Sequence, residues 1–373
     1  MNIEKVVKSK FELITSIRKE LNENAELSFK EYKTSDIIKK YLNEYGIETK
    51  SCFNTGVIGI LNKDESCIGL RADMDALPVN GVSHACGHDF HMAAAIGTAI
   101  VLKELGFSKN VKFIFQPGEE NTGGALPMIN EGVLESPDVK YIIGFHVWPG
   151  LPVGQIEAVS GASMGSVDDF NIEFTGKGGH AAMPYLCKNP IYPAIELIQS
   201  FNTKVLTEND PLNPFVVTFA SINAGNACNV ISDKAKVLGT VRTFEHELRK
   251  KLKEDLIKSS EICAEKYNCT VKVNYEDGYP PLINDKELTD NFIEHAKGIL
   301  GEKNVLPLTK SFAAEDFSFF AEKVPSVHFR LGIAENELGN EVLHSVNFTG
   351  SDNALYYAVM LTVSFIIKLA DKI

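Results

Sequence analysis

The chain has 373 residues and a formal net charge of −12, with 37 lysine and arginine residues against 49 aspartate and glutamate residues. Its 44% of hydrophobic residues is typical of a globular protein with a buried core, and the length exceeds one average domain. The acidic balance, with no basic run, argues against nucleic acid and anionic lipid as partners.

Targeting signals and disulfides are not expected. Residues 1–21 are charged throughout and lack the apolar segment of a signal peptide. The longest apolar runs, 92–102 and 354–367, are too short to span a bilayer and are expected to form buried helices. The seven cysteines form no compact framework and their number is odd, so we expect reduced thiols and a cytoplasmic location.

The first part of the chain predicts a layered α/β domain. Residues 1–45 carry apolar side chains at helical spacing and predict two helices that end before Gly46. Four short apolar runs and one helical stretch follow: 57–61, 67–70, 91–105 (the helix), 111–115 and 141–145. Strands that alternate with helices indicate a mixed, largely parallel sheet.

The pattern changes near residue 167. Apolar and polar residues alternate over 170–174, which predicts a half-exposed strand. A helix, two strands, a long helix and a last alternating strand are then predicted, at 190–206, 215–221, 235–242, 248–267 and 271–275. The order βαββαβ is typical of a ferredoxin-like α+β unit with one solvent-facing sheet surface.

After residue 279 the chain returns to helix, strand and helix, with the strand expected at 326–331 and the last helix at 352–369. The simplest interpretation is a satellite domain inserted into a larger one. We therefore predict a discontinuous catalytic domain, 1–166 with 279–373, and an inserted satellite domain, 167–278.

Metal-binding residue types directly follow three of the predicted strands. Asp73 and Asp75 follow strand 67–71, Glu119 and Glu120 follow strand 111–116, and His146 follows strand 141–145. In open parallel sheets, ligands bind beyond the carboxyl ends of the strands, so these side chains are expected to converge.

The loop before helix 91–105 adds another group. Cys86 and His88 are separated only by Gly87, so both side chains can turn toward one ion. Asp89 would either cap the helix or hold an imidazole in place.

Each of these residues alone has an ordinary structural explanation. Cys86 resembles a small buried apolar residue, His88 and His91 are polar groups at a helix start, and His146 is a core histidine. Glu119 and Glu120 are acids suited to a first helical turn. Together, however, four independent placements would have to fall on one edge of one sheet. An adjacent Glu pair also suits amide hydrolysis, because one carboxylate can bind metal while the other moves a proton.

Seven segments then resemble one family: RADMDALP, HACGHDFHMA, QPGEE, GFHVWPG, GKGGHAAMP, AEDFSF and LHSVNF, in that order. They resemble the amidohydrolase family of bacterial aminoacylases, hippurate hydrolase and plant indole-acetyl-amino-acid hydrolases, within the wider aminoacylase/carboxypeptidase metallopeptidases. The resemblance covers roughly residues 20–355. It implies a zinc-exopeptidase-like catalytic domain that carries an inserted ferredoxin-like satellite domain.

The resemblance also implies roles at the matching positions. A two-metal site would be formed by Cys86, His88, Glu120, His146 and His344, with Cys86 as the bridging thiolate. Glu119 would be the general base and then the general acid, and Asp75 would support the site. In the satellite domain, His180 would stabilise the oxyanion, often in the partner subunit's site. Asn229 and Arg242 would bind the substrate carboxylate.

The function implied is hydrolysis of an N-acyl-L-amino acid, of the aminoacylase or deacetylase type, by a water activated at two divalent ions. Thiolate and imidazole ligands suit Zn, Co or Ni, while Mn is common in relatives. A homodimer formed through the satellite domain is also implied. The nearest alternative is a dipeptidase or carboxypeptidase that uses the same site.

Two further alternatives are a Cys–His hydrolase with Cys86 as nucleophile and a non-catalytic binding protein. Neither explains the Glu pair together with His146.

The chain departs from the family at a few positions. The segment between Val79 and His84 is short, Gly118 replaces a commoner Ala, and Tyr185 follows HAAMP where relatives often have His. None of these changes affects an implied metal ligand or the base. They bear on substrate preference rather than on the reaction.

Overall fold

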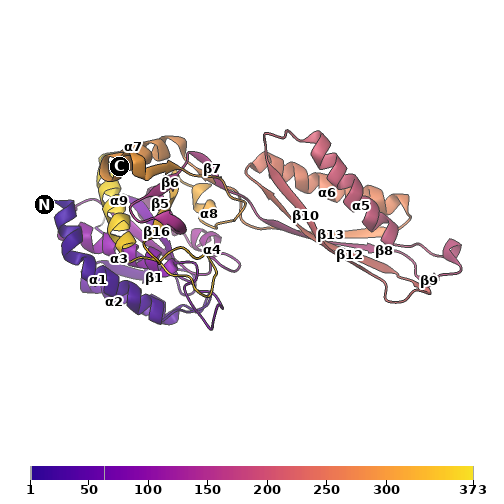
Figure 1. Ribbon diagram of the computed structural model, residues 1–373, viewed down its shortest axis with the longest axis horizontal. Coiled ribbons are helices and arrows are strands. Elements are labelled where there is room, and N and C mark those ends of the chain that lie inside the picture. Colours follow the sequence, from indigo (N-terminus) through magenta and orange to yellow (C-terminus); the bar gives the residue numbers. More distant parts are fainter. Residues whose placement is uncertain (1, 63, 373) are drawn as a thin grey trace. The chain divides into compact units, whose positions relative to one another are not determined.

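The computed structural model describes residues 2–62 and 64–372 and divides the chain into two compact units (Figure 1). The first unit is formed by Met1–Gly161, Ile283–Thr309 and Asp316–Ile373, and the second by Ala162–Leu282 and Lys310–Glu315. These units begin and end a few residues from the predicted domains, but residues 310–315 belong to the second unit, which the sequence did not indicate.

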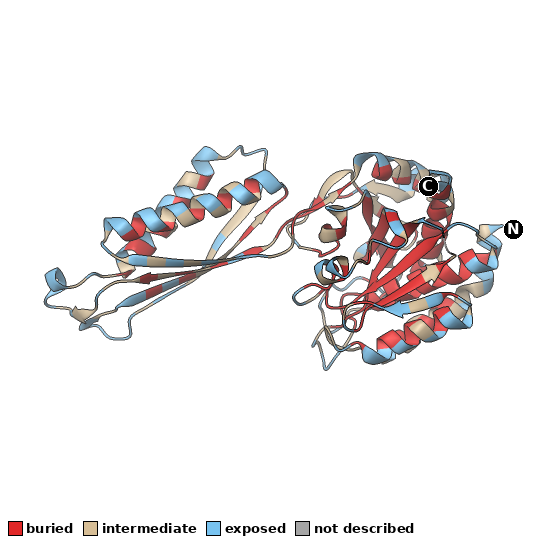
Figure 2. Ribbon diagram, turned by 180° about the vertical axis from the view of Figure 1, so that it is seen from behind, coloured by how far each residue is buried: buried red, intermediate tan, exposed pale blue. Residues whose placement is uncertain are grey.

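The first unit contains an eight-stranded mixed sheet in the order β1-β2-β4-β3-β5-β16-β6-β15. The strands are β1 (Glu48–Ser51), β2 (Val57–Leu61), β3 (Ser66–Asp73), β4 (Val111–Gln116), β5 (Asp138–Pro152), β6 (Ile156–Ala158), β15 (Val305–Pro307) and β16 (Ser326–Ala334). The four central strands β4, β3, β5 and β16 run parallel, which confirms the predicted largely parallel sheet. Of these strands, β3, β4 and β16 are buried along nearly their whole length because helices and loops cover the sheet (Figure 2).

Helices pack around this sheet. They are α1 (Ile3–Glu23), α2 (Tyr32–Glu44), α3 (His88–Glu104), α4 (Ala125–Asn130), α7 (Lys286–Leu300), α8 (Ser318–Ala321) and α9 (Asn353–Leu369), with the 3₁₀ turns Glu302–Asn304 and Ala370–Lys372. Every residue of α3 from His88 to Leu102 is buried, as expected of a helix that is apolar on all sides. Gly97 lets α1 approach closely, because a Cβ there would lie 2.8 Å from the Ile14 side chain.

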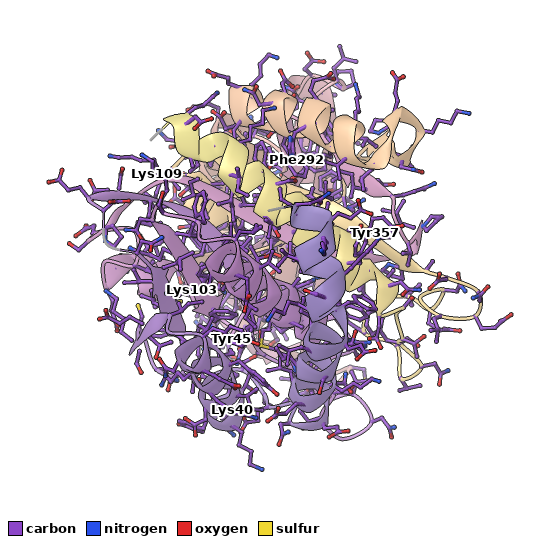
Figure 3. All side chains as sticks on the ribbon, turned by 90° about the vertical axis from the view of Figure 1, so that its left-hand side faces the viewer. Lys40, Tyr45, Lys103, Lys109, Phe292 and Tyr357 are labelled. Atoms are coloured by element: carbon purple, nitrogen blue, oxygen red, sulfur yellow. The ribbon has the colours of Figure 1, made fainter. Side chains whose placement is uncertain are left out.

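The last helix belongs to this core. Figure 3 shows α9 beside α1 and α7, and Phe292 of α7 lies 5.1 Å from the Phe365 ring of α9. Among the described residues, the segment Asn353–Lys372 is the one helix long and apolar enough to cross a membrane. Since 67% of its most apolar window is buried inside the protein, it is better explained as a core helix, as the sequence predicted.

The second unit confirms the predicted ferredoxin-like order. It contains β8 (Asp168–Thr175), α5 (Ile191–Glu208), β10 (Phe215–Ala224), β12 (Lys234–Thr243), α6 (His246–Lys266) and β13 (Thr270–Asp277), and its antiparallel sheet has the order β10-β12-β8-β13. Burial alternates along β8, because one face contacts α5 and α6 and the other faces solvent (Figure 2). Shorter elements of this unit are β9 (Gly179–His180), the 3₁₀ turn Pro184–Leu186 and β11 (Val230–Ile231), while β7 (Gly161–Met164) and β14 (Leu282–Asn284) cross the boundary between the units in the sequence.

Candidate active site

The carboxyl ends of the central strands bring the candidate residues to one level of the first unit. Asp73, the last residue of β3, pairs with Gln116, the last residue of β4. Leu70 of β3 pairs with Ile143 of β5, and three residues further along both strands Asp73 and His146 reach the same level. The prediction that His146 follows the end of its strand is wrong, because β5 continues to Pro152.

Four side chains gather around the thiol of Cys86. Its Sγ lies 3.3 Å from Nε2 of His146 and 3.3 Å from Nε2 of His344. Oε1 of Glu120 lies 3.2 Å from Nε2 of His344 and 3.8 Å from Nε2 of His88. Two triads therefore share the thiol: Cys86 with His88 and His146, and Cys86 with Glu120 and His344, each with its ligand atoms within 4.8 Å of one another.

Backbone carbonyl groups orient two of the imidazoles. Nδ1 of His88 lies 2.8 Å from the carbonyl oxygen of Asp75, and Nδ1 of His146 lies 2.7 Å from that of Val147. Each Nδ1 therefore donates its proton to a carbonyl, and each Nε2 is left to face the thiol cluster. Among the described residues, Nε2 of His88 is buried and has no hydrogen-bond partner, which fits a role as a metal ligand.

His91 is excluded as a ligand although it lies close to His88 and Asp73. Its Nδ1 donates to Oδ1 of Asp73 at 2.5 Å, and its Nε2 accepts the N–H of Val147 at 2.9 Å. Both ring nitrogens are thus occupied. Burial lowers the pKa of His91 to about 4, so the ring is neutral at physiological pH.

The charges around the cluster favour bound cations. Burial raises the pKa of the Cys86 thiol well above its ordinary value, and the carboxylates of Glu120 and Glu119 raise it further. Burial lowers the pKa of His88, but the negative charges of Asp73, Asp75 and Glu120 raise it to about 10. The surroundings therefore stabilise positive charge, and bound divalent ions would allow the thiolate and the neutral imidazole that metal binding requires.

The two glutamates lie on a turn held by Asp75. The backbone N–H groups of Glu119 and Glu120 donate to Oδ1 and Oδ2 of Asp75 at 3.1 and 3.0 Å. The ligand atoms of His88, Glu119 and Glu120 lie within 4.8 Å of one another. Glu119, only 9% exposed, therefore lies at the cluster together with Glu120.

His344 comes from the loop between β16 and α9, 258 residues after Cys86. Its backbone has φ 65°, in the left-handed region, and its N–H donates to the carbonyl of Ala85 at 2.8 Å. A non-glycine residue in this conformation is held there by its surroundings, which is common at functional sites. The contact ties the His344 loop to the Cys86 loop.

The structure adds a buried polar network that the sequence analysis missed. The guanidinium of Arg71 donates to Asp73 and to Asp316 at 2.8 Å each, and to Gln116 at 2.9 Å. Arg71 and Asp316 are 245 residues apart, so no local pattern could pair them. The RAD and AEDF segments were the available signal, but the motifs do not reveal which residues pair.

Neither suggested role for Asp89 is observed. Helix α3 begins at His88, and no side chain caps it. Asp89 instead accepts hydrogen bonds from Nε of Arg18 and Nδ2 of Asn22, both at 2.9 Å. The carboxylate that holds an imidazole is instead that of Asp73, which accepts the hydrogen bond from Nδ1 of His91.

The remaining candidates lie in the second unit. His180 is exposed in β9 and pairs with Val230 of β11, so it lies beside Asn229. Arg242 lies near the far end of β12, where it donates to the carbonyl of Phe312 at 2.8 Å. Arg242 lies eight positions after Lys234 in β12, roughly 27 Å at the usual rise of a strand, and Lys234 pairs with Thr175, five residues before His180. The structure therefore brings His180 and Asn229 together but not Arg242.

Residues 69–368 match peptidase family M20/M25/M40. The chain is 36% identical over 376 residues to hippurate hydrolase of Campylobacter jejuni, an alignment that covers 95% of each chain. It is 35% identical over 383 residues to thermostable carboxypeptidase 2 of Saccharolobus solfataricus, with 96% of each chain covered. It also resembles the crystal structure of a Bacillus subtilis protein described as a dinuclear metal-binding peptidase from the M20 family. That match has a TM-score of 0.85 at 32% identity and covers 98% of this chain and 99% of the other.

Proposed function

The chain belongs to peptidase family M20/M25/M40 and is a hydrolase of amide bonds, and on that premise we propose that it cleaves N-acyl-L-amino acids. The observation that carries this proposal is the pair of residue triads that share the Cys86 thiol, next to the carboxylate of Glu119. Divalent ions held by these triads, beside a carboxylate base, would supply the activated water, the polarised carbonyl and the proton transfer that hydrolysis of an amide requires.

We assign the two triads as the two metal sites. Cys86, His88 and His146 would hold one ion, and Cys86, Glu120 and His344 the other. When bound, the two ions activate a water and polarise the scissile carbonyl. Thiolate and imidazole ligands suit Zn, Co or Ni, and Mn is the further candidate from the family.

Glu119 would carry the proton. Its carboxylate lies beside the two triads, and its backbone N–H is fixed by Asp75 at 3.1 Å, so the side chain projects from a rigid turn. It would take a proton from the attacking water and then donate it to the nitrogen of the leaving amine. His180 would donate a hydrogen bond to the oxyanion.

A free carboxylate on the amine side of the scissile bond is the feature common to hippurate and to a carboxypeptidase substrate. Arg242 is the residue we assign to that carboxylate, with Asn229, because a guanidinium can hold a carboxylate through two parallel hydrogen bonds. The hippurate hydrolase and the thermostable carboxypeptidase are 36% and 35% identical to this chain, so the alternative proposal is peptide hydrolysis at the same site.

We propose a cytoplasmic homodimer formed through the second unit. Arg242 lies roughly 27 Å along β12 from Lys234, and Lys234 pairs with Thr175, five residues before His180, so we infer that one substrate of amino-acid size contacts both His180 and Arg242 through the contribution of two chains. The seven cysteines are free thiols, and the net charge of −12 disfavours nucleic acid and anionic lipid.

The test is amine release from N-acetyl and N-benzoyl amino acids and from dipeptides, with the protein loaded with Zn²⁺ or Mn²⁺ or treated with a chelator. We expect metal-dependent release that is fastest from an acyl amino acid. Faster release from dipeptides would select the alternative. Full activity after chelation would contradict the two-metal assignment, and no release from any compound would contradict the proposed substrate class.

A further inference from the structure

Two buried carboxylates, those of Glu31 and Asp75, hold the turn that carries Glu119 and Glu120. Three consecutive backbone N–H groups point at them: Gly118 donates to Oε1 of Glu31 at 3.0 Å, and the next two residues donate to Asp75 at 3.1 and 3.0 Å. With the N–H groups directed to one side, the turn is fixed relative to both carboxylates. Its orientation therefore depends on Glu31 as much as on Asp75.

Glu31 is fully buried, and the groups among the described residues that donate hydrogen bonds to its carboxylate are all neutral. Oε1 also accepts the N–H of Phe29 at 2.9 Å, and Oε2 accepts the hydroxyl of Thr55 at 2.5 Å. A buried carboxylate is costly to desolvate, and the three hydrogen bonds that Glu31 accepts offset that cost. One of these hydrogen bonds comes from Gly118, so the acid at this position also holds the turn that carries Glu119 and Glu120.

The same N-terminal segment reaches Asp75. Oγ of Ser28 donates to Oδ2 of Asp75 at 2.6 Å, the oxygen that also accepts the N–H of Glu120. The Phe29 ring closes the other side, because a Cβ on Gly118 would lie 2.3 Å from it. Residues 28–31 thus contact the turn at successive points, although they lie 87 residues before it in the sequence.

We propose that Glu31 is a positioning residue which, with Ser28 and Asp75, orients the Glu119–Glu120 turn toward the metal centre. The inference rests on the proposed function of that centre. Because Asp75 also accepts the Nδ1 proton of His88 through its carbonyl, a displaced turn changes the alignment of the base and of the carboxylate relative to the imidazole. Substrate contacts outside the turn are unchanged, so kcat is affected more than KM.

The experiment compares three single variants of the full chain. Glu31→Met removes both acceptor oxygens at similar volume. Glu31→Gln keeps an oxygen for Gly118 and Phe29 and places its amide N–H₂ against the Thr55 hydroxyl, which can accept. Thr55→Val is the matched control, since it removes a hydrogen bond to the same carboxylate but no contact with the turn.

Two measurements are made on each folded variant: kcat and KM on the best substrate, and the absorption spectrum and affinity of Co²⁺ added to the metal-free protein. We expect Glu31→Met to lower kcat or Co²⁺ affinity by about 10- to 100-fold, the usual effect of losing a supporting group at a metal site. Glu31→Gln should recover most of the loss, and Thr55→Val should leave both readouts near wild type.

Equal losses in Glu31→Met and Thr55→Val, or wild-type kcat and Co²⁺ affinity in Glu31→Met, would overturn the inference. If Glu31→Met does not fold, Ser28→Ala replaces it, with an altered Co²⁺ spectrum expected and an unchanged one contradicting the proposal. The Co²⁺ titration needs no substrate. A wild-type protein that binds Co²⁺ but cleaves no acyl amino acid would therefore refute the proposed function and still test the role of Glu31.

Discussion

Replacing Glu119 by glutamine separates proton transfer from metal binding. Glutamine has nearly the same size and shape as glutamate, and the Glu119 backbone N–H would still donate to Oδ1 of Asp75, so the turn is expected to keep its conformation. The two triads around Cys86 do not include Glu119. The variant should therefore bind both ions while lacking the group that accepts a proton from water.

The magnitude follows from what a positioned base contributes. General acid–base catalysis by a side chain is worth about 10²- to 10⁴-fold in rate, which corresponds to about 3–5 kcal/mol of transition-state stabilisation. We expect kcat to fall within that range. KM should change little, because Glu119 acts on the water and the leaving nitrogen rather than on the bound substrate.

The assay measures kcat and KM for the best substrate of the amine-release panel, with the metal content of the same preparation determined by elemental analysis. Glu65→Gln, an exposed carboxylate of the first unit, is the control for loss of one negative charge. A Glu119→Gln variant with full metal content and near-normal kcat would refute the assignment of the base. A variant without metal would instead show that Glu119 belongs to the ligand set.

Three further predictions concern the turn, the pH dependence and the subunits. Gly118→Ala should destabilise the protein by at least about 1–3 kcal/mol, since φ is +71° and a Cβ would lie 2.3 Å from the Phe29 ring; wild-type thermal stability would contradict this. Burial lowers the pKa of His295 to about 4, so the unfolded chain binds the proton on this residue more tightly than the folded chain does. The stability that His295 contributes above about pH 6.5 is therefore lost as the pH falls toward 4. The melting temperature should decrease over that interval, and less so in His295→Gln; equal slopes in both proteins would contradict the role of His295. Mixing His180→Ala with Glu119→Gln, each inactive alone, should restore up to about a quarter of wild-type activity through mixed dimers if His180 serves the partner's site. No recovery in subunits shown to exchange, or a monomer in light scattering, would exclude such sharing.

Local patterns predicted the second unit well because its sheet has one exposed face. Alternation at Phe170, Ile172 and Phe174 corresponds directly to the buried face of β8, and the intervening residues face outward. The first unit gave a coarser result. Its central strands are buried on both sides, so their sequences contain apolar runs that locate strands without fixing their ends.

The length of β5 shows where such reasoning fails. The apolar run 141–145 predicted a strand that ends directly before His146. In the structure β5 continues to Pro152, because β16 pairs with it as far as Ala334, past an irregularity after Gly332. This continuation depends on a strand from much later in the chain, and no pattern within residues 138–152 reports it.

The candidate ligands were predictable for a different reason. Cys86, His88, Glu120 and His146 each follow or adjoin a strand or helix that the periodicity had located, and parallel strands bring their carboxyl ends to one edge. His344 lies in a loop with no periodic neighbour and was found only through the resemblance. The residues that orient these ligands were mostly missed, since partners such as Arg71 and Asp316 are defined by tertiary packing.

Acids balanced by arginine differ from the acid beside Cys86 in the kind of cation that they contact, and this difference bears on the chemistry of the site. Asp89 is held by Arg18, and Asp73 and Asp316 by Arg71, so their charges are balanced by guanidinium groups fixed in the fold. Among the described residues Glu120 has no guanidinium partner, and the imidazoles of His344 and His88 lower its pKa to about 2 against the opposing effect of burial. Arginine cannot give up its charge, whereas a histidine next to a carboxylate can exchange its proton for a metal ion. Arginines with a permanent charge thus contact the acids that maintain the structure. Histidines, which can lose their proton, lie beside Cys86, where divalent ions would bind.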